Sequence, residues 1–452
     1  MSEKTPPANS NETKQSNPSR RDFIKTGSAV AGGAAFGTAT LGSLSMAQAN
    51  HAYGSDEIKL GLIGCGGRGT GAVVQAMNTK GPTKLVAMAD VFADRLQGSL
   101  RGIKGRHADK VDVPEDRQFV GLDGYKGVVE SDADVVLMAT SPGFRPLHFE
   151  ACIKAGKHVF AEKPVATDAP GIRRFLEAGE LGTQTGLLVQ IGLQRRHEEA
   201  ELETIARLHD GAIGDITATR VYWNGGGVWT RPRQEGQTEL EYQVRNWYYF
   251  NWLCGDHICE QHIHNLDVGC WVHNDYPVSA NGMGGRQVRT SKEHGEIYDH
   301  HAVEYTFADG SKMFSQCRHQ PGCWNQVSEY AHGTDGYCEI AAGKIYNAKG
   351  DLIFHSKGKR GGHQEEHHDL FADIRAGKRP NEAEYGAKST MVAILGRMCT
   401  YGGKTVKWQD AINSDIALAD FDSLVKLDQE APVKPNDDMT YEIPTPGKTK
   451  VV

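Results

Sequence analysis

The chain has 452 residues, which is long enough for two packed domains. Charged residues make up 24% and hydrophobic residues 39%, as in ordinary globular proteins, and no apolar run reaches the length of a membrane span. The formal net charge of -7 and the scattered lysines and arginines argue against nucleic acid as a partner. Nine dispersed cysteines, without the paired spacing of a zinc site, predict mostly buried thiols.

Residues 1–49 have the pattern of an export signal. Arg20 and Arg21 precede a weakly apolar, glycine- and alanine-rich run over residues 26–46, and small residues close the segment at Ala47 and Ala49. This pattern predicts a twin-arginine signal cleaved after Ala49. A basic patch before a surface helix is the alternative, but the glycine-rich run is a poor helix former. We expect a periplasmic or otherwise exported protein that uses the twin-arginine translocation machinery, which moves proteins already folded.

A glycine turn opens the part of the chain expected to fold. Residues 58–63 form an apolar strand, and the motif Gly64-x-Gly66-x-x-Gly69 leads directly into a helical pattern over residues 72–77. Gly64 permits the tight turn, Gly66 leaves room for a pyrophosphate, and Gly69 allows close packing of helix and strand. Phosphates would then bind at the helix N-terminus, beside Gly67 and Arg68.

The next strand favours NAD as the cofactor. Residues 84–90 form an apolar run that ends in Asp90, at about the spacing of a ribose-binding carboxylate. That carboxylate would repel a 2'-phosphate, although Arg95 lies close enough in sequence for NADP to stay open as an alternative.

Further strands over residues 134–140 and 157–161 alternate with helical segments. This alternation predicts an α/β Rossmann domain with a doubly wound parallel sheet over residues 56–187. Ligands of such sheets bind beyond the carboxyl ends of the strands. We therefore expect the residues that follow these strands to border the cofactor: Thr140, Pro142, Glu162 and Lys163.

These motifs together resemble the family of glucose-fructose oxidoreductase, inositol dehydrogenase and MocA proteins (Gfo/Idh/MocA). The resemblance rests on the glycine turn, on residues 139–142 followed by His148, and on residues 155–159 leading into Glu162-Lys163-Pro164. It spans nearly all of the chain after the signal. In such enzymes the lysine of the Glu-Lys-Pro element stands near the nicotinamide and the reacting carbon, so the resemblance assigns that place to Lys163. A cation there stabilises developing alkoxide charge during oxidation of an alcohol.

The resemblance also implies the architecture of residues 188–445. Family members have an α+β C-terminal domain here, with a large, mostly antiparallel open sheet that covers the nicotinamide and carries a sugar or polyol. The open face of that sheet often mediates dimers or tetramers in relatives, so we expect a homo-oligomer.

His264 is the candidate general acid/base. On a helix, Glu260 and His264 would share one face because they are four residues apart, whereas His262 would point to the opposite side. Inositol-dehydrogenase-like members carry an aspartate four residues before the catalytic histidine, and the ending His264-Asn-Leu-Asp267 approximates their motif. Glu260 stands in place of that aspartate and would orient His264, with Asp256 one turn earlier as a substitute.

Other candidate substrate contacts combine polar groups with an aromatic surface on which a sugar ring can stack. An ordinary surface or core role is at least as consistent with each of them. They are Arg195, Arg196, Arg245, Asn246, Trp247 and Asp256.

Two clusters of histidine and acidic residues invite a metal interpretation, one over residues 257–264 and one over residues 363–367. The first lacks the second histidine of a zinc-protease helix, and hydride transfer in the family requires no metal, so we predict no metal site. Solvated charges account for His363, Glu366 and His367.

Three functions follow from this reading. The first is oxidation or reduction of a secondary alcohol or ketone on a sugar, sugar derivative or cyclitol, with a tightly held NAD, Lys163 polarising the oxygen and His264 exchanging its proton. The second is an NAD-dependent glycoside hydrolase or lyase that oxidises its substrate transiently, although we do not find the Thr-His-Gly-type element of such enzymes. The third is a non-catalytic sugar- or dinucleotide-binding protein.

Overall fold

The computed structural model describes residues 57–452. The predicted signal over residues 1–49 and its cleavage site lie outside this range. In the described part, no helix is long and apolar enough to cross a membrane. All nine cysteines are free, and eight of them are buried, with Cys323 as the exposed exception.

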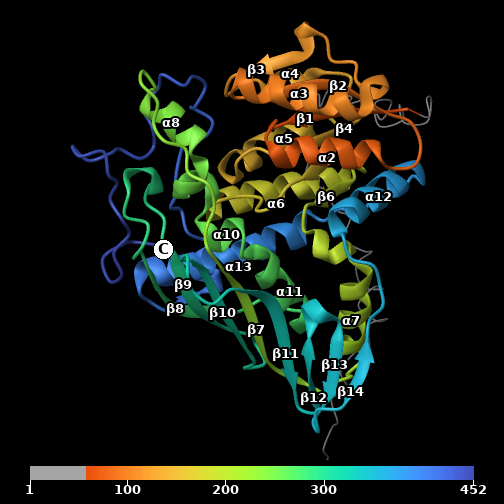
Figure 1. Cartoon of the computed structure of the whole chain (residues 1–452), viewed down its shortest axis with the longest axis vertical. Coiled ribbons are helices and arrows are strands. Elements are labelled where there is room, and N and C mark those ends of the chain that lie inside the picture. Colours follow the sequence, from red (N-terminus) through yellow and green to blue (C-terminus); the bar gives the residue numbers. More distant parts are fainter. Residues whose placement is uncertain (1–56) are drawn as a thin grey trace, which may run out of the picture. The chain divides into compact units, whose positions relative to one another are not determined.

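The first sheet is a six-stranded parallel sheet in the order β3-β2-β1-β4-β5-β6 (Figure 1). This arrangement confirms the doubly wound Rossmann fold expected from the alternating pattern. Its strands are β1 (Ile58–Ile63), β2 (Thr83–Asp90), β3 (Gln118–Val120), β4 (Val135–Met138), β5 (His158–Ala161) and β6 (Val189–Ile191). Its helices are α2 (Gly67–Met77), α3 (Ala93–His107), α4 (Tyr125–Glu130), α5 (Arg145–Lys154) and α6 (Ala169–Gln184).

The fold of this half follows from strand composition. The strands β1, β2, β4 and β5 are apolar runs that are almost wholly buried, as expected when helices cover both faces of a parallel sheet. Strand β6 belongs to the same sheet although it lies beyond residue 187, the domain boundary expected from the sequence. We propose to move that boundary to about residue 192.

The second sheet has nine strands in the order β14-β13-β12-β11-β7-β10-β9-β8-β15. Only the β7–β10 pair is parallel, which confirms the expectation of a large, mostly antiparallel sheet. Its strands are β7 (Ile216–Gly225), β8 (Ser279–Gly285), β9 (His300–Thr306), β10 (Lys312–His319), β11 (Gln326–Gly333), β12 (Gly336–Glu339), β13 (Lys344–Asn347), β14 (Leu352–His355) and β15 (Val406–Lys407).

Helices join the two sheets. The buried helix α13 packs against both α6 and β8, and α12 returns to pack on α2 of the first half (Figure 1). Leu370, Phe371 and Ile374 of α12 belong to the same apolar cluster as Leu60 and Val73. The helices of this part are α7 (Glu199–His209), α8 (Glu239–Arg245), α9 (Asn251–Cys254), α10 (His257–Glu260), α11 (Ile263–His273), α12 (Gly362–Arg375), α13 (Ala383–Gly402) and α14 (Trp408–Ile412).

Candidate active site

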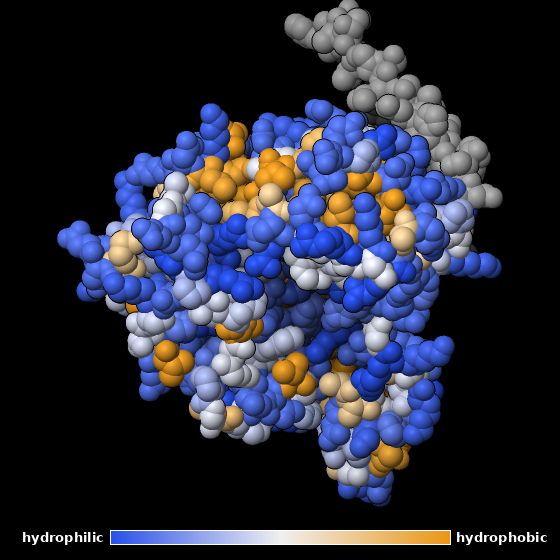
Figure 2. Space-filling model, turned by 45° about the horizontal axis from the view of Figure 1, so that its top comes forward, coloured by the Kyte–Doolittle hydropathy of each residue, from blue (hydrophilic) through white to orange (hydrophobic). Residues whose placement is uncertain are grey.

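One cavity of about 630 Å³ collects most of the predicted site residues. Its lining combines the glycine turn and the carboxyl ends of β2, β4 and β5 with residues from α10, α11, α12 and β7. The face of the molecule in Figure 2 is hollowed between its upper and lower parts, with hydrophilic side chains around the hollow. The predicted residues that line the cavity are Gly64, Gly66, Gly67, Arg68, Asp90, Arg95, Thr140, His148, Glu162, Lys163, Arg245, Trp247, Glu260 and His264.

The glycine turn has the geometry that a dinucleotide requires. Gly64 has a φ of 94°, and a Cβ there would lie 2.6 Å from the backbone of Ala139 and Thr140. A Cβ on Gly69 would lie 2.0 Å from the Gly64 carbonyl oxygen, so helix and strand pack as closely as predicted. A Cβ on Gly66 or Gly67 would meet nothing within 4 Å, which leaves open space at the N-terminus of α2 for a pyrophosphate. The turn therefore fits a dinucleotide.

Asp90 is tied to this turn. One oxygen of its carboxylate accepts a hydrogen bond from the Cys65 backbone N–H at 2.7 Å, and the other accepts from the Phe92 N–H at 2.9 Å. Burial raises the pKa of Asp90, and these two N–H donors oppose the shift. Because each carboxylate oxygen can accept more than one hydrogen bond, Asp90 keeps acceptor capacity toward the cavity.

Glu162 pairs with the glycine turn. Its Oε1 lies 3.1 Å from Nε of Arg68, and only 4% of Glu162 is exposed. In the structure its ion pair is with Arg68, so Glu162 links the end of β5 to the phosphate-binding turn.

His148 lines the cavity from α5. Its ring stacks on Tyr125 at 4.3 Å between ring centroids, and its Nδ1 lies 3.3 Å from the Thr140 hydroxyl. Burial, with smaller effects of Arg145 and Arg174, lowers the pKa of His148 to about 3, so the ring is neutral. Pro142 is buried and does not line the cavity, in contrast to the expectation from its position after β4.

Lys163 and Glu260 meet inside the cavity. Lys163 Nζ lies 3.1 Å from Glu260 Oε1 and also donates a hydrogen bond to the backbone carbonyl of Glu260. Their side chains are only 12% and 15% exposed, respectively. A lysine ammonium has three N–H donors, so one remains for a third partner such as a substrate oxygen.

The structure corrects the expected pairing of Glu260 with His264. One continuous helix would place both side chains on the same face, but α10 ends at Glu260 and α11 begins at Ile263. Because the helix is interrupted, the four-residue spacing no longer places both side chains on one face, and the Glu260 carboxylate binds Lys163 instead.

His264 nevertheless lines the cavity. Its Nδ1 is buried without a hydrogen-bond partner among residues 57–452, which leaves Nε2 as the nitrogen available to a ligand. Burial, followed by the charges of Lys163 and Arg195, holds the pKa of His264 well below its usual range. The ring stacks on Trp223 at 6.0 Å. His262 lies away from the cavity and contacts the Ser315 hydroxyl at 2.7 Å, as the sequence predicted for its opposite side.

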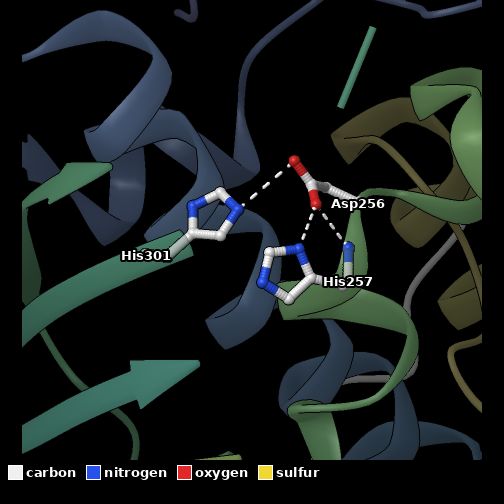
Figure 3. Close-up of side chains that lie close together, drawn as sticks. All are labelled: Asp256, His257 and His301. Atoms are coloured by element: carbon white, nitrogen blue, oxygen red, sulfur yellow. Dashed lines mark hydrogen bonds and ion pairs between the residues drawn. The ribbon is translucent and has the colours of Figure 1, made fainter. Parts of the chain in front are cut away.

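Asp256 is buried rather than at the substrate, which corrects its assignment as a substrate contact. Its Oδ1 lies 2.7 Å from Nδ1 of His257, and its Oδ2 accepts from the Tyr298 backbone N–H at 2.9 Å and the Tyr401 hydroxyl at 2.6 Å. His301 Nε2 lies 3.3 Å from the same Oδ2 (Figure 3). Although burial opposes it, the two histidines hold the pKa of Asp256 well below its usual range.

The donor atoms of Asp256, His257 and His301 lie within 4.8 Å of one another, and among the described residues they form the cluster compact enough for a metal ion. The carboxylate already accepts hydrogen bonds on both oxygens, so hydrogen bonding accounts for the arrangement. The network fixes the start of α10, which carries Glu260 toward the cavity.

The remaining substrate candidates separate into two groups. Trp247 and Arg245 line the cavity, but the Arg245 guanidinium faces Asp94 on the nucleotide side, with NH1 2.9 Å from Oδ2. Arg195 does not line the cavity, because it is paired with the buried Glu329. Arg196 and Asn246 are likewise held in internal hydrogen bonds, with Asp267 and Glu293 as partners.

Sequence reasoning missed several residues of the cavity. His363 lines it, and Glu366 and His367 are fully buried, so the interpretation of this segment as solvated charges was wrong. The reason is that α12 packs against the first domain, which no local pattern indicates. Other missed lining residues are Tyr125, Arg145, Gln194, Trp223, Trp229, Arg231 and Gln261. Only Gln261, beside Glu260, had a local signal that could have singled it out.

Comparison with known proteins agrees with this geometry. Residues 58–192 match the Gfo/Idh/MocA model described as "Oxidoreductase family, NAD-binding Rossmann fold", and residues 17–37 match the twin-arginine translocation signal. The chain is similar to an inositol 2-dehydrogenase of Klebsiella pneumoniae, with 28% identity over 58% of this chain and 68% of that protein. An inositol 2-dehydrogenase of Acidothermus cellulolyticus is 30% identical over 35% of this chain and 42% of its own length.

Solved structures share the fold over 78% of this chain and 99% of theirs. They include the aldose-aldose oxidoreductase of Caulobacter crescentus, with a TM-score of 0.61 and 18% identity. They also include the scyllo-inositol dehydrogenase of Lactobacillus casei with NAD(H) and scyllo-inositol, with a TM-score of 0.59 and 19% identity.

The fold and the glycine turn define an NAD-binding oxidoreductase. Its nucleotide domain is of the Gfo/Idh/MocA family, among inositol 2-dehydrogenase relatives, and the chain carries a twin-arginine signal sequence.

Proposed function

We propose that this protein is an exported, NAD-dependent oxidoreductase that acts on a secondary alcohol or ketone of a sugar, sugar derivative or cyclitol. One observation carries the proposal: Lys163, Glu260 and His264 line the same cavity as the open glycine turn. When bound, NAD supplies a hydride acceptor or donor for the substrate carbon. The protein's own residues have to bind the substrate oxygen and move its proton.

Lys163 is the residue proposed to hold that oxygen. Two of its N–H donors are used by Glu260, and the resulting fixed position leaves one donor for the substrate. An ammonium held in a mostly buried site stabilises negative charge on an alcohol oxygen as its proton leaves. Glu260 therefore positions Lys163, and it does not position His264.

His264 is the proposed proton acceptor. Because its pKa is lowered, the imidazole is neutral near pH 7 and can take the alcohol proton on Nε2. The same shift makes the protonated ring a strong acid, which suits return of the proton in the reverse, ketone-reducing direction.

The substrate class is supported by the walls of the cavity and by its relatives. Three tryptophans line the cavity, namely Trp223, Trp229 and Trp247, and the last two make an edge contact at 6.0 Å. Flat aromatic faces beside polar groups are suited to sugar and cyclitol rings. Relatives are inositol 2-dehydrogenases, and structures of similar fold were solved with scyllo-inositol or levoglucosan.

We further propose that NAD stays bound as a resident group, held by a clasp from the second half of the chain. Arg245 at the end of α8 pairs with Asp94, with NH2 2.8 Å from Oδ1, and its guanidinium lies 3.7 Å from the ring centre of Phe92. Both partners follow Asp90 closely in sequence. Gln243 of the same helix donates a hydrogen bond to the Val433 carbonyl at 2.6 Å, which holds the helix that carries Arg245.

A resident cofactor fits the export route. The twin-arginine signal supports translocation of a folded protein to the periplasm, with cleavage proposed after Ala49. Free NAD is scarce outside the cytoplasm, so a protein that carries its dinucleotide with it avoids this shortage.

The test begins with a mass spectrum of the purified protein lacking residues 1–49, in which bound NAD(H) is expected. Sugars and cyclitols, including myo-inositol, are then screened for reduction of bound NAD by absorbance. On the best substrate, Lys163→Met is expected to lower kcat at least about a hundredfold while nucleotide content stays unchanged. Lys154→Met, which alters an exposed lysine of α5, is the matched control.

The proposal fails if no nicotinamide nucleotide binds, or if Lys163→Met leaves turnover intact. Steady release of nitrophenol from p-nitrophenyl glycosides, without added cofactor and without net NADH, would instead support the glycoside hydrolase alternative.

A further inference from the structure

Gln261 occupies the break between α10 and α11 and lines the cavity beside Glu260 and His264. Its side-chain Oε1 lies 2.7 Å from Nε2 of His319. Among residues 57–452, its amide nitrogen has no hydrogen-bond partner. The direction of the one hydrogen bond to His319 therefore decides what Gln261 offers to a ligand.

His319 is a buried histidine at the end of β10, with only 3% of its surface exposed. Its ring packs near those of His257 and Tyr248, at centroid distances of 4.5 and 6.1 Å. Burial, then the charges of His257 and Arg289, lowers the pKa of His319 far below its usual range. The ring is neutral, so one nitrogen carries a proton and the other is an acceptor.

Arg289 determines which nitrogen carries the proton. This buried guanidinium donates to the Tyr298 carbonyl at 2.5 Å through NH1, and its NH2 contacts Nδ1 of His319. An arginine only donates hydrogen bonds and is not deprotonated in proteins. Nδ1 of His319 must therefore accept, its proton must lie on Nε2, and Nε2–H must donate to Oε1 of Gln261.

We propose that Gln261 is a specificity-determining residue whose amide presents only N–H donors to the substrate. The inference rests on the proposed function and deepens it. A substrate of this site carries an acceptor oxygen, from a hydroxyl, carbonyl or carboxylate group, near the reacting carbon. An ammonium group facing the Gln261 amide meets only N–H donors from that side chain, so Gln261 disfavours amino sugars at this position.

The first experiment measures the proton of His319 without any substrate. Nitrogen NMR of the full protein lacking its signal, labelled with ¹⁵N-histidine, gives the tautomer of each ring, and His319→Asn assigns the signal. We expect a neutral ring protonated at Nε2. A proton on Nδ1, or a charged ring near pH 7, would overturn the inference whatever the enzyme acts on.

The second experiment tests what Gln261 presents to a ligand. Binding of D-glucose and of its 2-, 3- and 4-amino-deoxy analogues to the NAD-loaded protein is followed by tryptophan fluorescence. At one position, the wild type is expected to bind the amino sugar at least about tenfold more weakly than glucose. Gln261→Glu still accepts from His319 but turns an acceptor to the cavity, so this preference should shrink or reverse.

Gln316→Glu adds the same charge at an exposed position on β10 and serves as the control. Identical preferences in the wild type and Gln261→Glu at all three positions would overturn the inference. If none of the four sugars binds although NAD does, glucose-like sugars are excluded as ligands of this site, and the NMR result alone supports or overturns the role of Gln261.

Discussion

The two sides of the cavity are built in different ways. The nucleotide side comes mostly from residues 64–163, in which the glycine turn, Asp90, Thr140 and Lys163 lie at or just beyond the ends of strands of one parallel sheet. The substrate side combines residues from β7, the α10–α11 junction and α12, which are spread along the sequence from Trp223 to His363. Local backbone geometry therefore defines the cofactor site, whereas long-range packing defines the substrate site.

The largest expected effect is on the substrate side, at His264. His264→Gln should lower kcat by about 10²–10⁴-fold because the general base is lost, while bound NAD is retained. In the wild type, the lowered pKa of His264 keeps the base neutral in acid, so the acidic limb of the rate profile should lie below the usual histidine range of about 6.5. Steady-state rates between pH 4 and 8 test both, and an acidic limb near 6.5 would contradict the assignment.

On the nucleotide side, two glycines of one turn should respond differently. Gly69→Ala forces a Cβ onto the Gly64 carbonyl and should destabilise the fold by about 1–3 kcal/mol. Gly66→Ala meets no protein atom, so the free energy of unfolding should be nearly unchanged while NAD binding weakens. Urea unfolding and calorimetric titration with NAD separate the effects. Equal loss of stability in both variants would contradict the open space assigned to the pyrophosphate.

Buried histidines should make stability depend on pH. Burial lowers the pKa of His148 and His262 to about 3 and that of His257 to about 4, whereas unfolded histidines titrate near 6.5. Below pH 6.5 these histidines therefore bind protons in the unfolded chain but not in the folded chain. The free energy of unfolding should fall from about pH 6.5 toward 4, by up to about 1.4 kcal/mol per pH unit for each histidine.

Urea unfolding at several pH values between 4.5 and 7.5 measures this slope. His262→Asn removes one such histidine, so the slope of the unfolding free energy against pH should fall by the amount that corresponds to about one proton. A free energy of unfolding that rises on acidification over this range would contradict the prediction.

The smallest expected effect concerns the clasp. Asp94 is 60% exposed, so its pair with Arg245 is screened by solvent, and Arg245→Met should speed release of NADH only about two- to fivefold. Stopped-flow fluorescence of bound NADH measures the rate. Arg117→Met, at another exposed ion pair of the first half, is the control and should leave it unchanged. The double exchange Asp94→Arg with Arg245→Asp should restore slow release; unchanged release in Arg245→Met would argue against the clasp.

Much of the nucleotide side could be predicted because its residues act through local geometry. Position 64 requires a positive φ, position 69 has no room for a Cβ, and Asp90 has to lie at the end of a strand. Each requirement restricts the residue type within a short motif and can be recognised there. Pro142 shows the limit of that reasoning. It follows a strand end as expected, but it is buried and does not line the cavity, because a residue's place in the sequence does not determine which way its side chain points.

The substrate side was predicted less well because its contacts cross the chain. Arg195 and Asp256 have the chemistry of substrate ligands, but each is taken up by buried partners that only the fold brings near, such as Glu329 and Tyr401. Helical spacing predicted that Glu260 pairs with His264. The helix is interrupted for two residues, and the Glu260 carboxylate binds Lys163 instead.

The sequence by itself determined the export signal, the doubly wound nucleotide domain and the position of Lys163 and His264 as the residues to examine. The first two features depend on short motifs and on strand and helix periodicity, which neighbouring residues encode, whereas the roles of Lys163 and His264 also rest on the resemblance to the Gfo/Idh/MocA family. Only the tertiary structure decided that Lys163 is held by Glu260, that His363 joins the cavity, and that Gln261 presents N–H donors. The direction of the Gln261 hydrogen bond depends on Arg289 and His319, which lie next to Gln261 only because the second sheet is folded.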